Sequence, residues 1–279
     1  MIVFEPKVET KKIQTARIVI KIGSSTITEG GTAEQPLNLT LINNIAEQCS
    51  DLFKRGVQVA IVSSGAVASG KNLLGTAENT IRDRQVEAVF GQPALIYAWI
   101  KAFRYQGVIA GQMLLTENDL KTPPEALKKA LEEGIVIINA NDAICDREMK
   151  QLLISADNDK LAGFVAGAIG ADTLVILTDV EGVKNTQGCI IQDGLLIDGR
   201  VIFDSKSKDG TGGMESKVKV LKRLAKNGIK GVIAAAKGDI VLDVVKCPFI
   251  KTCAPSGRLV ATKSPVPLKS GRPFSKLNL

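Results

Sequence analysis

The sequence predicts an α/β fold, a three-layer αβα sandwich built around a mostly parallel β-sheet. Short apolar runs rich in branched residues recur along the chain and are bounded by turn residues, as buried strands are. Stretches with helical apolar periodicity separate these runs, and this alternation is typical of parallel strands joined by crossover helices. The chain has 279 residues, 45% of them hydrophobic, which suffices for one large domain with a substantial core.

The expected elements follow one another in this alternation. The predicted strands cover residues 17–22, 57–62, 108–115, 135–140, 173–178 and 229–234. The predicted helices cover residues 39–54, 65–74, 81–105, 123–133, 158–169 and 213–227. Residues 180–208 depart from the pattern, because their short β-like runs indicate a β-rich insertion or lid. No linker divides the body, so we expect one domain over residues 1–253 and a basic, proline-containing tail over residues 254–279.

The composition excludes several classes of function. The chain has no histidine, which rules out Ser-His-Asp and Cys-His catalysis as well as histidine metal sites. Its five cysteines are scattered without a metal-ligand spacing and indicate reduced cytosolic thiols. No uncharged run reaches the length of a membrane span, and the N-terminus lacks the apolar core of a signal peptide. We therefore expect a cytoplasmic protein with no membrane partner.

The net charge of +7 is a property of the C-terminal end. From Val244 to Leu279 the chain carries seven basic residues and no acidic one, which equals the whole net charge, so the body is neutral. A basic tail with almost no aromatic residues is more typical of a solvated terminus than of an RNA-binding arm. We do not expect a nucleic-acid partner.

The first predicted strand, Arg17-Ile-Val-Ile-Lys-Ile22, carries a lysine near its C-terminal end. A charged amine in such a strand is costly to desolvate unless an anion lies close to it. Ligands of open α/β sheets bind beyond the carboxyl ends of the strands. Lys21 and the backbone N–H groups of residues 23–26 would therefore form a cradle suited to phosphate. The alternative is an edge-strand lysine that extends its stem along the surface to reach water.

Further polar motifs follow other predicted strands or open helices. They are the turn Ser63-Ser-Gly65, the strand end Asn139-Ala-Asn-Asp142, the helix start Asp157-Asn-Asp159 and the pair Thr178-Asp179. The Ser63-Ser-Gly65 turn leads into a helix whose initial N–H groups can bind an anion, although a plain serine cap explains this turn equally well. The Asp-Asn-Asp cluster exceeds what capping requires and suits an ammonium group or a cation.

The segment Gly210-Thr-Gly-Gly-Met-Glu-Ser-Lys217 is the most specific local signal. Three glycines before a helix let the backbone approach a ligand closely, and Lys217 adds a point charge. The segment does not match the phosphate-binding pattern G-x-x-x-x-G-K-[ST]. A flexible glycine turn followed by a surface lysine is the alternative interpretation.

Phosphoryl transfer depends on positioning and charge neutralisation. The sequence offers suitable groups for it, namely two lysines, two helix-initiating glycine turns and several strand-end aspartates. The absence of histidine narrows the chemical class of the group that could accept the phosphoryl group. A hydroxyl acceptor profits from a general base, whereas a substrate carboxylate with a pKa of about 4.3 is already ionised at neutral pH. The residues therefore suggest a kinase that forms an acyl phosphate, although an aspartate remains available as a base.

Taken together, these motifs resemble the amino acid kinase family over about residues 17–250. The motifs that carry the resemblance stand in the family's order and are Lys-Ile-Gly-Ser-Ser, Val-Ser-Ser-Gly-Ala-Val-Ala-Ser-Gly, Gly-Gln-Met-Leu-Leu-Thr, Ile-Asn-Ala-Asn-Asp, Asp-Asn-Asp, Leu-Thr-Asp and Gly-Thr-Gly-Gly-Met. Within the family they are similar to the members that phosphorylate the side-chain carboxylate of L-glutamate, the first step of proline biosynthesis. The resemblance implies the αβα sandwich of this family, with ATP and Mg²⁺ as cofactors.

The resemblance also implies roles for individual residues. Lys21 and Lys217 would flank the transferring phosphoryl group, and Asp159 would orient both lysines. The residues implied on the glutamate side are Ser64, Gly65, Asn139, Asp142 and Asn158. The residues implied on the ATP side are Gly23, Thr178, Asp179, Thr211, Gly212 and Gly213. No protein ligand is assigned to the metal, because Mg²⁺ would be held largely by ATP phosphates and water.

The chain departs from the family pattern at the acceptor loop. Ala140 replaces an acidic residue, the segment 143–156 is longer than usual, and Ala156 replaces a glycine. This loop would cover the amino acid and an overlapping site for proline as a feedback inhibitor. We expect a homo-oligomer, as is common in the family, and no C-terminal PUA domain.

Two other functions stay open at this point. The first keeps phosphoryl transfer but changes the acceptor, because the departures cluster in the acceptor loop. The second is a non-catalytic regulator that binds a nucleotide or proline, with the basic tail touching RNA. The presence of both lysines and of Asp159 disfavours the second, because a sensor does not need all three.

Overall fold

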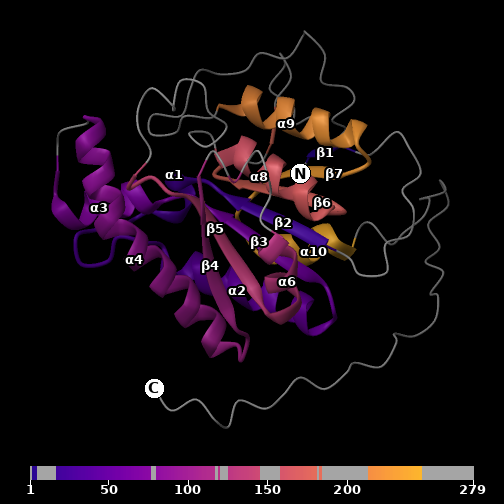
Figure 1. Ribbon diagram of the computed structural model, residues 1–279, viewed down its shortest axis with the longest axis horizontal. Helices are drawn as coiled ribbons and strands as arrows, with labels where there is room; N and C mark the ends of the chain where they lie inside the picture. The colour runs from indigo at the N-terminus through magenta and orange to yellow at the C-terminus, as the bar shows by residue number, and fades with distance from the viewer. Residues whose placement is uncertain are drawn as a thin grey trace.

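The computed structural model describes residues 2–4, 17–76, 80–116, 119, 125–144, 158–180, 182–183 and 213–246. A sheet with the strand order β1-β7-β6-β2-β3-β5-β4 forms the centre of this part of the chain (Figure 1). The strands are β1 (Ile2–Phe4), β2 (Arg17–Ile22), β3 (Gln58–Ser63), β4 (Ala110–Leu115), β5 (Ile135–Ala140), β6 (Thr173–Thr178) and β7 (Lys230–Ala235). Only β1 runs antiparallel among these strands, so the predicted mostly parallel sheet is confirmed.

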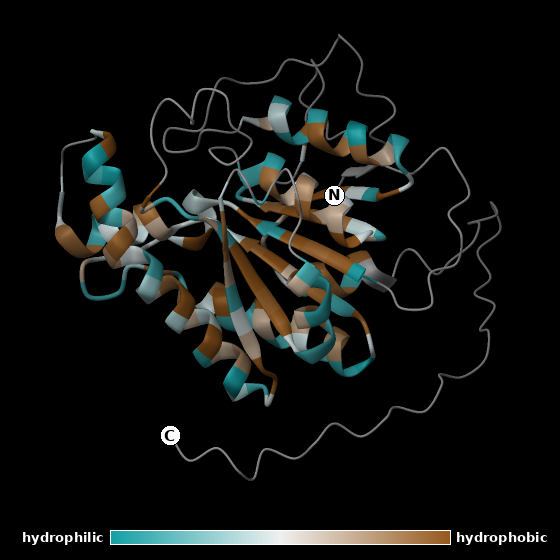
Figure 2. Cartoon of the chain, viewed as in Figure 1, coloured by the Kyte–Doolittle hydropathy of each residue, from teal (hydrophilic) through white to brown (hydrophobic). Residues whose placement is uncertain are grey.

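Helices cover both faces of the sheet. They are α1 (Ser24–Ile27), α2 (Leu39–Lys54), α3 (Ala66–Leu74), α4 (Ile81–Tyr105), α6 (Glu125–Glu133), α8 (Asn158–Ile169), α9 (Met214–Lys226) and α10 (Ile240–Lys246). Helices α6, α8 and α9 pack on one face, and α2, α4 and α10 pack on the other. Figure 2 shows the hydrophobic strands between the layers and hydrophilic residues on the outer sides of the helices. The three-layer αβα sandwich is therefore confirmed.

The predicted bounds agree with the structure to within two residues for each expected element in the described part of the chain. Three elements were not predicted. The strand β1 has three residues and depends on long-range pairing with β7, α1 is a single turn, and α10 lies at the approach to the basic tail. The expected insertion at 180–208, apart from residues 180, 182 and 183, and the tail at 254–279 lie outside the described residues.

Side chains of the central strand β2 alternate between the two faces of the sheet. Ile18, Ile20 and Ile22 belong to the apolar core shared with α2 and α4, whereas Val19 packs in the core beneath α8 and α9. Lys21 has the same parity as Val19, so its side chain projects toward α8 and α9. The register of one strand thus decides which helices can supply partners for this lysine.

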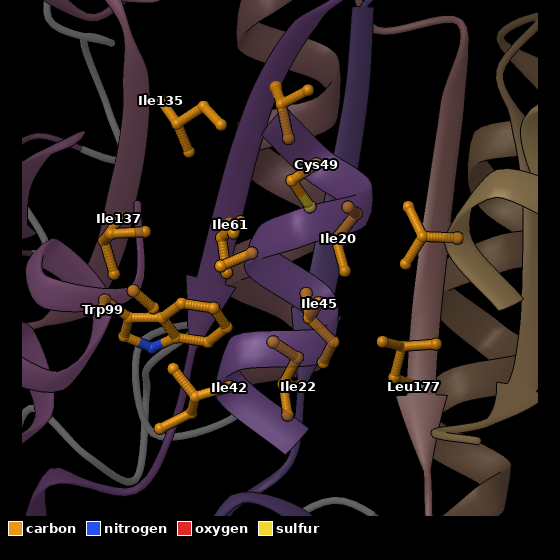
Figure 3. Close-up of a cluster of buried hydrophobic side chains, with 14 of the residues drawn as sticks. Ile20, Ile22, Ile42, Ile45, Cys49, Ile61, Trp99, Ile135, Ile137 and Leu177 are labelled. Atoms are coloured by element: carbon orange, nitrogen blue, oxygen red, sulfur yellow. The ribbon is translucent and has the colours of Figure 1, made fainter. Parts of the chain in front are cut away.

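The core on the α2 and α4 face is closely filled by branched and aromatic side chains (Figure 3). Ile20, Ile61 and Trp99 are fully buried there, and Trp99 stacks against Phe103 with ring centroids 5.9 Å apart. Cys49 lies in the same core, where burial raises the pKa of its thiol. This cysteine is therefore an uncharged packing group and not a nucleophile.

Helices α3 and α4 approach each other at two glycines. A Cβ atom on Gly91 would lie 1.8 Å from the carbonyl oxygen of Ala66, and one on Gly70 would lie 1.8 Å from that of Glu87. Only glycine permits such backbone contact between helices. The contact fixes α4 against the start of α3, which is the same point at which the Ser63-Ser-Gly65 turn leaves the sheet. Among the described residues, no helix combines the length and apolar character needed to cross a bilayer.

Candidate active site

Lys21 and Lys217 come from distant parts of the sequence and meet at one carboxylate. The Nζ atom of Lys21 lies 2.7 Å from Asp159 Oδ1, and that of Lys217 lies 2.9 Å from Asp159 Oδ2. Asp159 is fully buried, and both lysines are buried as well. The convergence expected from the sequence is therefore observed.

These three side chains carry two positive charges and one negative charge. Buried ion pairs normally balance, because an excess of charge in a low-dielectric environment is costly. Two ammonium groups at the carboxyl end of the central strand can attract an anion. Lys21 and Lys217 supply donors in different directions around a shared carboxylate, which is an arrangement that can surround a phosphoryl group.

The local structure explains how each member of the cluster is held. Asp159 lies in the first turn of α8, and Lys217 lies in the first turn and a half of α9. Gly213 is the N-cap of α9 in an extended conformation, and its carbonyl accepts from the N–H groups of Ser216 and Lys217. Both helices therefore begin beside the carboxyl end of β2, where their N-terminal dipoles also favour an anion.

The residues expected on the ATP side lie at the ends of β2 and β6. These two strands are direct neighbours, with Ile22 opposite Leu177, so Thr178-Asp179 follows beside Gly23. The Thr178 hydroxyl donates to Asp179 Oδ1 at 2.9 Å. A Cβ atom on Gly23 would lie 3.8 Å from Lys21 Nζ, which places the Gly23 backbone next to the ammonium group. Among the residues expected here, Thr211 and Gly212 lie outside the described residues.

Chain direction also changes between β2 and β6. From β2 the chain continues to β3 on one side, whereas from β6 it continues to β7 on the other. Ligands of open α/β sheets bind at such a switch point, beyond the carboxyl ends of the strands. Lys21 lies on one of the two strands that flank this point.

Several of the residues expected on the acceptor side gather around the end of β3. The Ser64 N–H donates to the Ile22 carbonyl at 3.1 Å, and the Asn158 Nδ2 group donates to Ser64 Oγ at 2.5 Å. The Oδ1 atom of Asn158 is buried and has no hydrogen-bond partner among the described residues. Gly65 adopts φ = 110° as the N-cap of α3, and a Cβ atom there would lie 2.5 Å from Ile27 Cγ2. Asn158 and Ser64 thus form one polar group next to Asp159.

Asn139 and Asp142 lie at the end of β5, which pairs directly with β3. Asn139 is buried, and Asp142 lines a cavity of about 350 Å³ between α4, β4 and the end of β5. Ala140 is buried at the end of β5, while the acceptor loop is described only as far as residue 144. The structure therefore places Asn139 and Asp142 one strand away from Ser64.

Two residues of α4 support this region and were not predicted from the sequence. The Trp99 Nε1 group donates to Ser63 Oγ at 3.0 Å, and Gln92 Oε1 accepts from Asn139 Nδ2 at 2.9 Å. Gln92 and Trp99 are seven residues apart and so lie on the same side of the helix. The only signal in the sequence was a polar side chain within an otherwise largely apolar stretch, which does not identify a partner.

Comparison with known proteins places the chain in a family. Residues 16–235 match the model of the amino acid kinase family. The chain is 36% identical to the glutamate 5-kinase of Clostridium acetobutylicum over 236 residues, which cover 78% of this chain and 86% of that protein.

It is also 36% identical to the glutamate 5-kinase of Shigella flexneri over 248 residues, with 82% of this chain and 66% of that protein covered. A third relative, the glutamate 5-kinase of Trichlorobacter lovleyi, is 34% identical over 89% of this chain and 67% of its own length. The chain thus spans about two thirds of the length of the latter two relatives.

Among solved structures, the fold is similar to that of the carbamate kinase from Giardia lamblia bound to AMP-PNP. The TM-score is 0.54 at 17% sequence identity, with 84% of this chain and 96% of the other covered. At this identity the similarity concerns the fold alone. The matched family model spans the strands β2 to β7 and the whole buried cluster around Asp159, and so the chain belongs to the amino acid kinase family.

Proposed function

We propose that this protein is an ATP-dependent kinase that phosphorylates the side-chain carboxylate of L-glutamate to give L-glutamyl 5-phosphate, the first step of proline biosynthesis. The observation that carries the proposal is the buried Lys21–Asp159–Lys217 cluster at the carboxyl end of the central strand. The relatives named glutamate 5-kinase support this acceptor, because they are 34–36% identical over most of the chain.

In the proposed mechanism, the two lysines stabilise the charge on the transferring phosphoryl group. Asp159 holds both ammonium groups at fixed positions, so little reorganisation is needed when the charge develops. The acceptor carboxylate is already ionised at neutral pH, and it attacks the γ-phosphorus of ATP without a general base. The bond from this phosphorus to the β,γ-bridging oxygen breaks, and ADP leaves with both electrons of that bond.

The remaining site residues have proposed binding roles. Ser64, Gly65, Asn139, Asp142 and Asn158 would hold the amino acid, and Gly23, Thr178, Asp179 and the Thr211-Gly-Gly213 segment would hold ATP. Asp142 suits the substrate ammonium group by its charge. The described residues contain no group of three or more acidic or cysteine side chains placed to hold a metal. Mg²⁺ would be held largely by ATP phosphates and water, which suits an ion that dehydrates reluctantly.

Other expectations stay predictions. They are the division into a kinase domain over residues 1–253 and a basic tail, the cytoplasmic location, the homo-oligomeric state and feedback inhibition by proline. The acceptor-loop departures, including Ala140, do not favour a different acceptor over glutamate, given the names of the relatives.

The test is turnover with a defined acceptor. The full chain is incubated with ATP, Mg²⁺ and L-glutamate, ADP release is followed, and the acyl phosphate is trapped with hydroxylamine as a hydroxamate. We expect ADP release that depends on glutamate and yields one hydroxamate per ADP. The same assay with aspartate, glutarate and other carboxylates serves as the specificity control. ADP release with another acceptor but not with glutamate would contradict the proposal.

A further inference from the structure

Gln92 ends a hydrogen-bond chain whose direction is fixed by the backbone. The Ala140 N–H group donates to Asn139 Oδ1 at 2.9 Å, and a backbone N–H can only donate. Asn139 must therefore present its Nδ2 group to Gln92, whose Oε1 atom accepts at 2.9 Å. This sequence of donors and acceptors fixes the orientation of both side-chain amides. The second arm of the Gln92 amide is consequently an N–H₂ group.

That N–H₂ group has no partner within the described part of the chain. Gln92 Nε2 is buried from solvent and makes no hydrogen bond there. Buried donors are nearly always satisfied, so an unsatisfied one calls for an explanation. Asn139 and Trp99 show that α4 otherwise satisfies its polar contacts with the strand ends. An acceptor oxygen that arrives with a ligand would complete the pairing of Gln92.

The position of Gln92 restricts which ligand group this oxygen belongs to. Gln92 lines the 350 Å³ cavity together with Asn141 and Asp142, and the α4 wall of this cavity is mostly apolar. The sheet order β2-β3-β5-β4 places Lys21 at the end of β2 and Asn139 at the end of β5, with β3 between them. A substrate whose reacting carboxylate lies at Lys21 would extend its other end toward β5 and Gln92.

The chemistry of the neighbouring groups supports the same assignment. Asn158 Oδ1 is a buried acceptor without a partner among the described residues, and Asp142 lines the cavity with a carboxylate. Both suit an ammonium group and neither suits a carboxylate. An amino acid carries a carboxylate beside its ammonium group, and this carboxylate needs N–H donors. Gln92 Nε2 is a buried donor of this kind near the non-reacting end of the proposed substrate.

We propose that Gln92 is a specificity residue that donates from Nε2 to the main-chain carboxylate of the acceptor amino acid, while its Oε1 atom holds Asn139 in place. This assignment rests on the proposed function. It makes Gln92 the group that distinguishes an amino acid from an acceptor that has only the reacting carboxylate and the amine.

Two substitutions separate the two contacts of Gln92. Gln92→Glu keeps an oxygen for Asn139 but replaces the N–H donor by an acceptor. Gln92→Met removes both contacts at nearly the same volume. Each variant and the wild type are assayed with L-glutamate and with 4-aminobutyrate, which is glutamate without the main-chain carboxylate. The kcat/KM for each acceptor is taken from rates at low acceptor concentration, together with the KM for ATP.

We expect Gln92→Glu to lower kcat/KM for glutamate by about 10-fold or more, because a hydrogen bond to a charged group is lost and an acceptor now faces the carboxylate. The kcat/KM for 4-aminobutyrate should change by less than about 3-fold, and the KM for ATP should stay the same. The preference for glutamate over 4-aminobutyrate would therefore shrink by about 3-fold or more. Gln92→Met should reduce this preference as well and should also lower activity on both acceptors.

An equal loss on both acceptors in Gln92→Glu, or no loss at all, would overturn the assignment. Failure of the proposed function is distinguishable, because in that case the wild-type protein itself does not phosphorylate glutamate. Wild-type turnover of glutamate with an unchanged preference in Gln92→Glu leaves the proposed function intact and rejects the role of Gln92.

Discussion

The two ends of strand β2 hold a buried or half-buried cation in contrasting ways. At the amino end, Arg17 is surrounded by acceptors of the fold. Its backbone N–H donates to Asp172 Oδ2 at 2.6 Å, its Nε to Gln58 Oε1 at 2.6 Å and its Nη1 to the Ile169 carbonyl at 3.0 Å. The guanidinium therefore has an amide oxygen and a carbonyl oxygen as partners, while the Asp172 carboxylate accepts from the backbone N–H of the same residue. This is the balance expected of a structural contact.

At the carboxyl end, two cations meet at one carboxylate. Lys21 and Lys217 both contact the carboxylate of Asp159, and Asn158 nearby keeps a buried oxygen without a partner among the described residues. The fold thus satisfies its polar groups at one end of the strand and concentrates positive charge at the other. The amino end of β2 is thus built on bonds from one guanidinium to neutral acceptors, whereas the carboxyl end brings together ionised side chains from β2, α8 and α9, as functional sites often do.

The largest expected effect comes from removing one cation at the carboxyl end. Lys217→Ala should lower kcat by about 10²–10³-fold, which is typical when one preorganised group that stabilises transition-state charge is lost. The fold should persist, because Lys21 and Asp159 remain as a balanced pair. Steady-state kinetics with glutamate and thermal unfolding followed by circular dichroism measure the two quantities.

Lys219→Ala is the matched control on the same helix. Its ammonium group forms an exposed ion pair with Glu215, with 73% of the Lys219 side chain exposed against 11% for Lys217. This control should retain wild-type turnover. Turnover of Lys217→Ala equal to that of Lys219→Ala would contradict the role assigned to Lys217.

The opposite outcome is expected at the amino end. Arg17→Met leaves Gln58 Oε1 and the Ile169 carbonyl without their donor, so the free energy of unfolding should fall by about 2 kcal/mol. The KM values for glutamate and ATP should not change. Urea denaturation and steady-state kinetics test both statements. Arg55→Met, which breaks an exposed ion pair with Asp51, should cost no more than about 0.5 kcal/mol. A kinetic defect in Arg17→Met without loss of stability would contradict a purely structural role for Arg17.

Substituting Asp172 should have a smaller effect on the free energy of unfolding, and this effect should depend on pH. Burial raises the pKa of the Asp172 carboxyl above its usual range, so the folded protein binds this proton more tightly than the unfolded chain. The stabilisation from protonation is complete below the unfolded pKa of about 3.9 and is lost as the pH rises through the folded value. Asp172→Asn should therefore gain stability relative to the wild type between about pH 4 and pH 7.

Urea denaturation of both proteins over this pH range measures the difference. A difference that stays constant, or that falls as the pH rises, would show that ionisation of Asp172 is not coupled to folding in this way. Turnover should be unaffected in either case, because Asp172 lies at the end of the sheet opposite Asp159.

Much of this architecture follows from local sequence patterns. The branched apolar run at β2 and the Ser63-Ser-Gly65 turn predict a strand and a helix start, because propensity and turn chemistry are local properties. The meeting of Lys21 with Lys217 was expected from the resemblance to the amino acid kinase family, because local patterns do not place these two distant segments relative to each other.

The contacts of α4 were not predictable in the same way. The pairing of Gln92 with Asn139 and of Trp99 with Ser63 depends on how a long helix lies across two strand ends. Helical periodicity indicates which residues share a face, but it does not indicate which strand that face meets. The strand β1 was missed for a related reason, since its three residues depend on pairing with the distant strand β7.

In the proposed mechanism, two ammonium groups held by the Asp159 carboxylate surround the same migrating phosphoryl group. A crystal structure of the full chain with ADP, Mg²⁺, L-glutamate and aluminium fluoride tests it most directly, because the metal fluoride mimics the phosphoryl group in transit. We expect the Nζ atoms of both Lys21 and Lys217 within about 3 Å of fluoride atoms. A fluoride group bound elsewhere, with both lysines contacting only Asp159, would contradict the account.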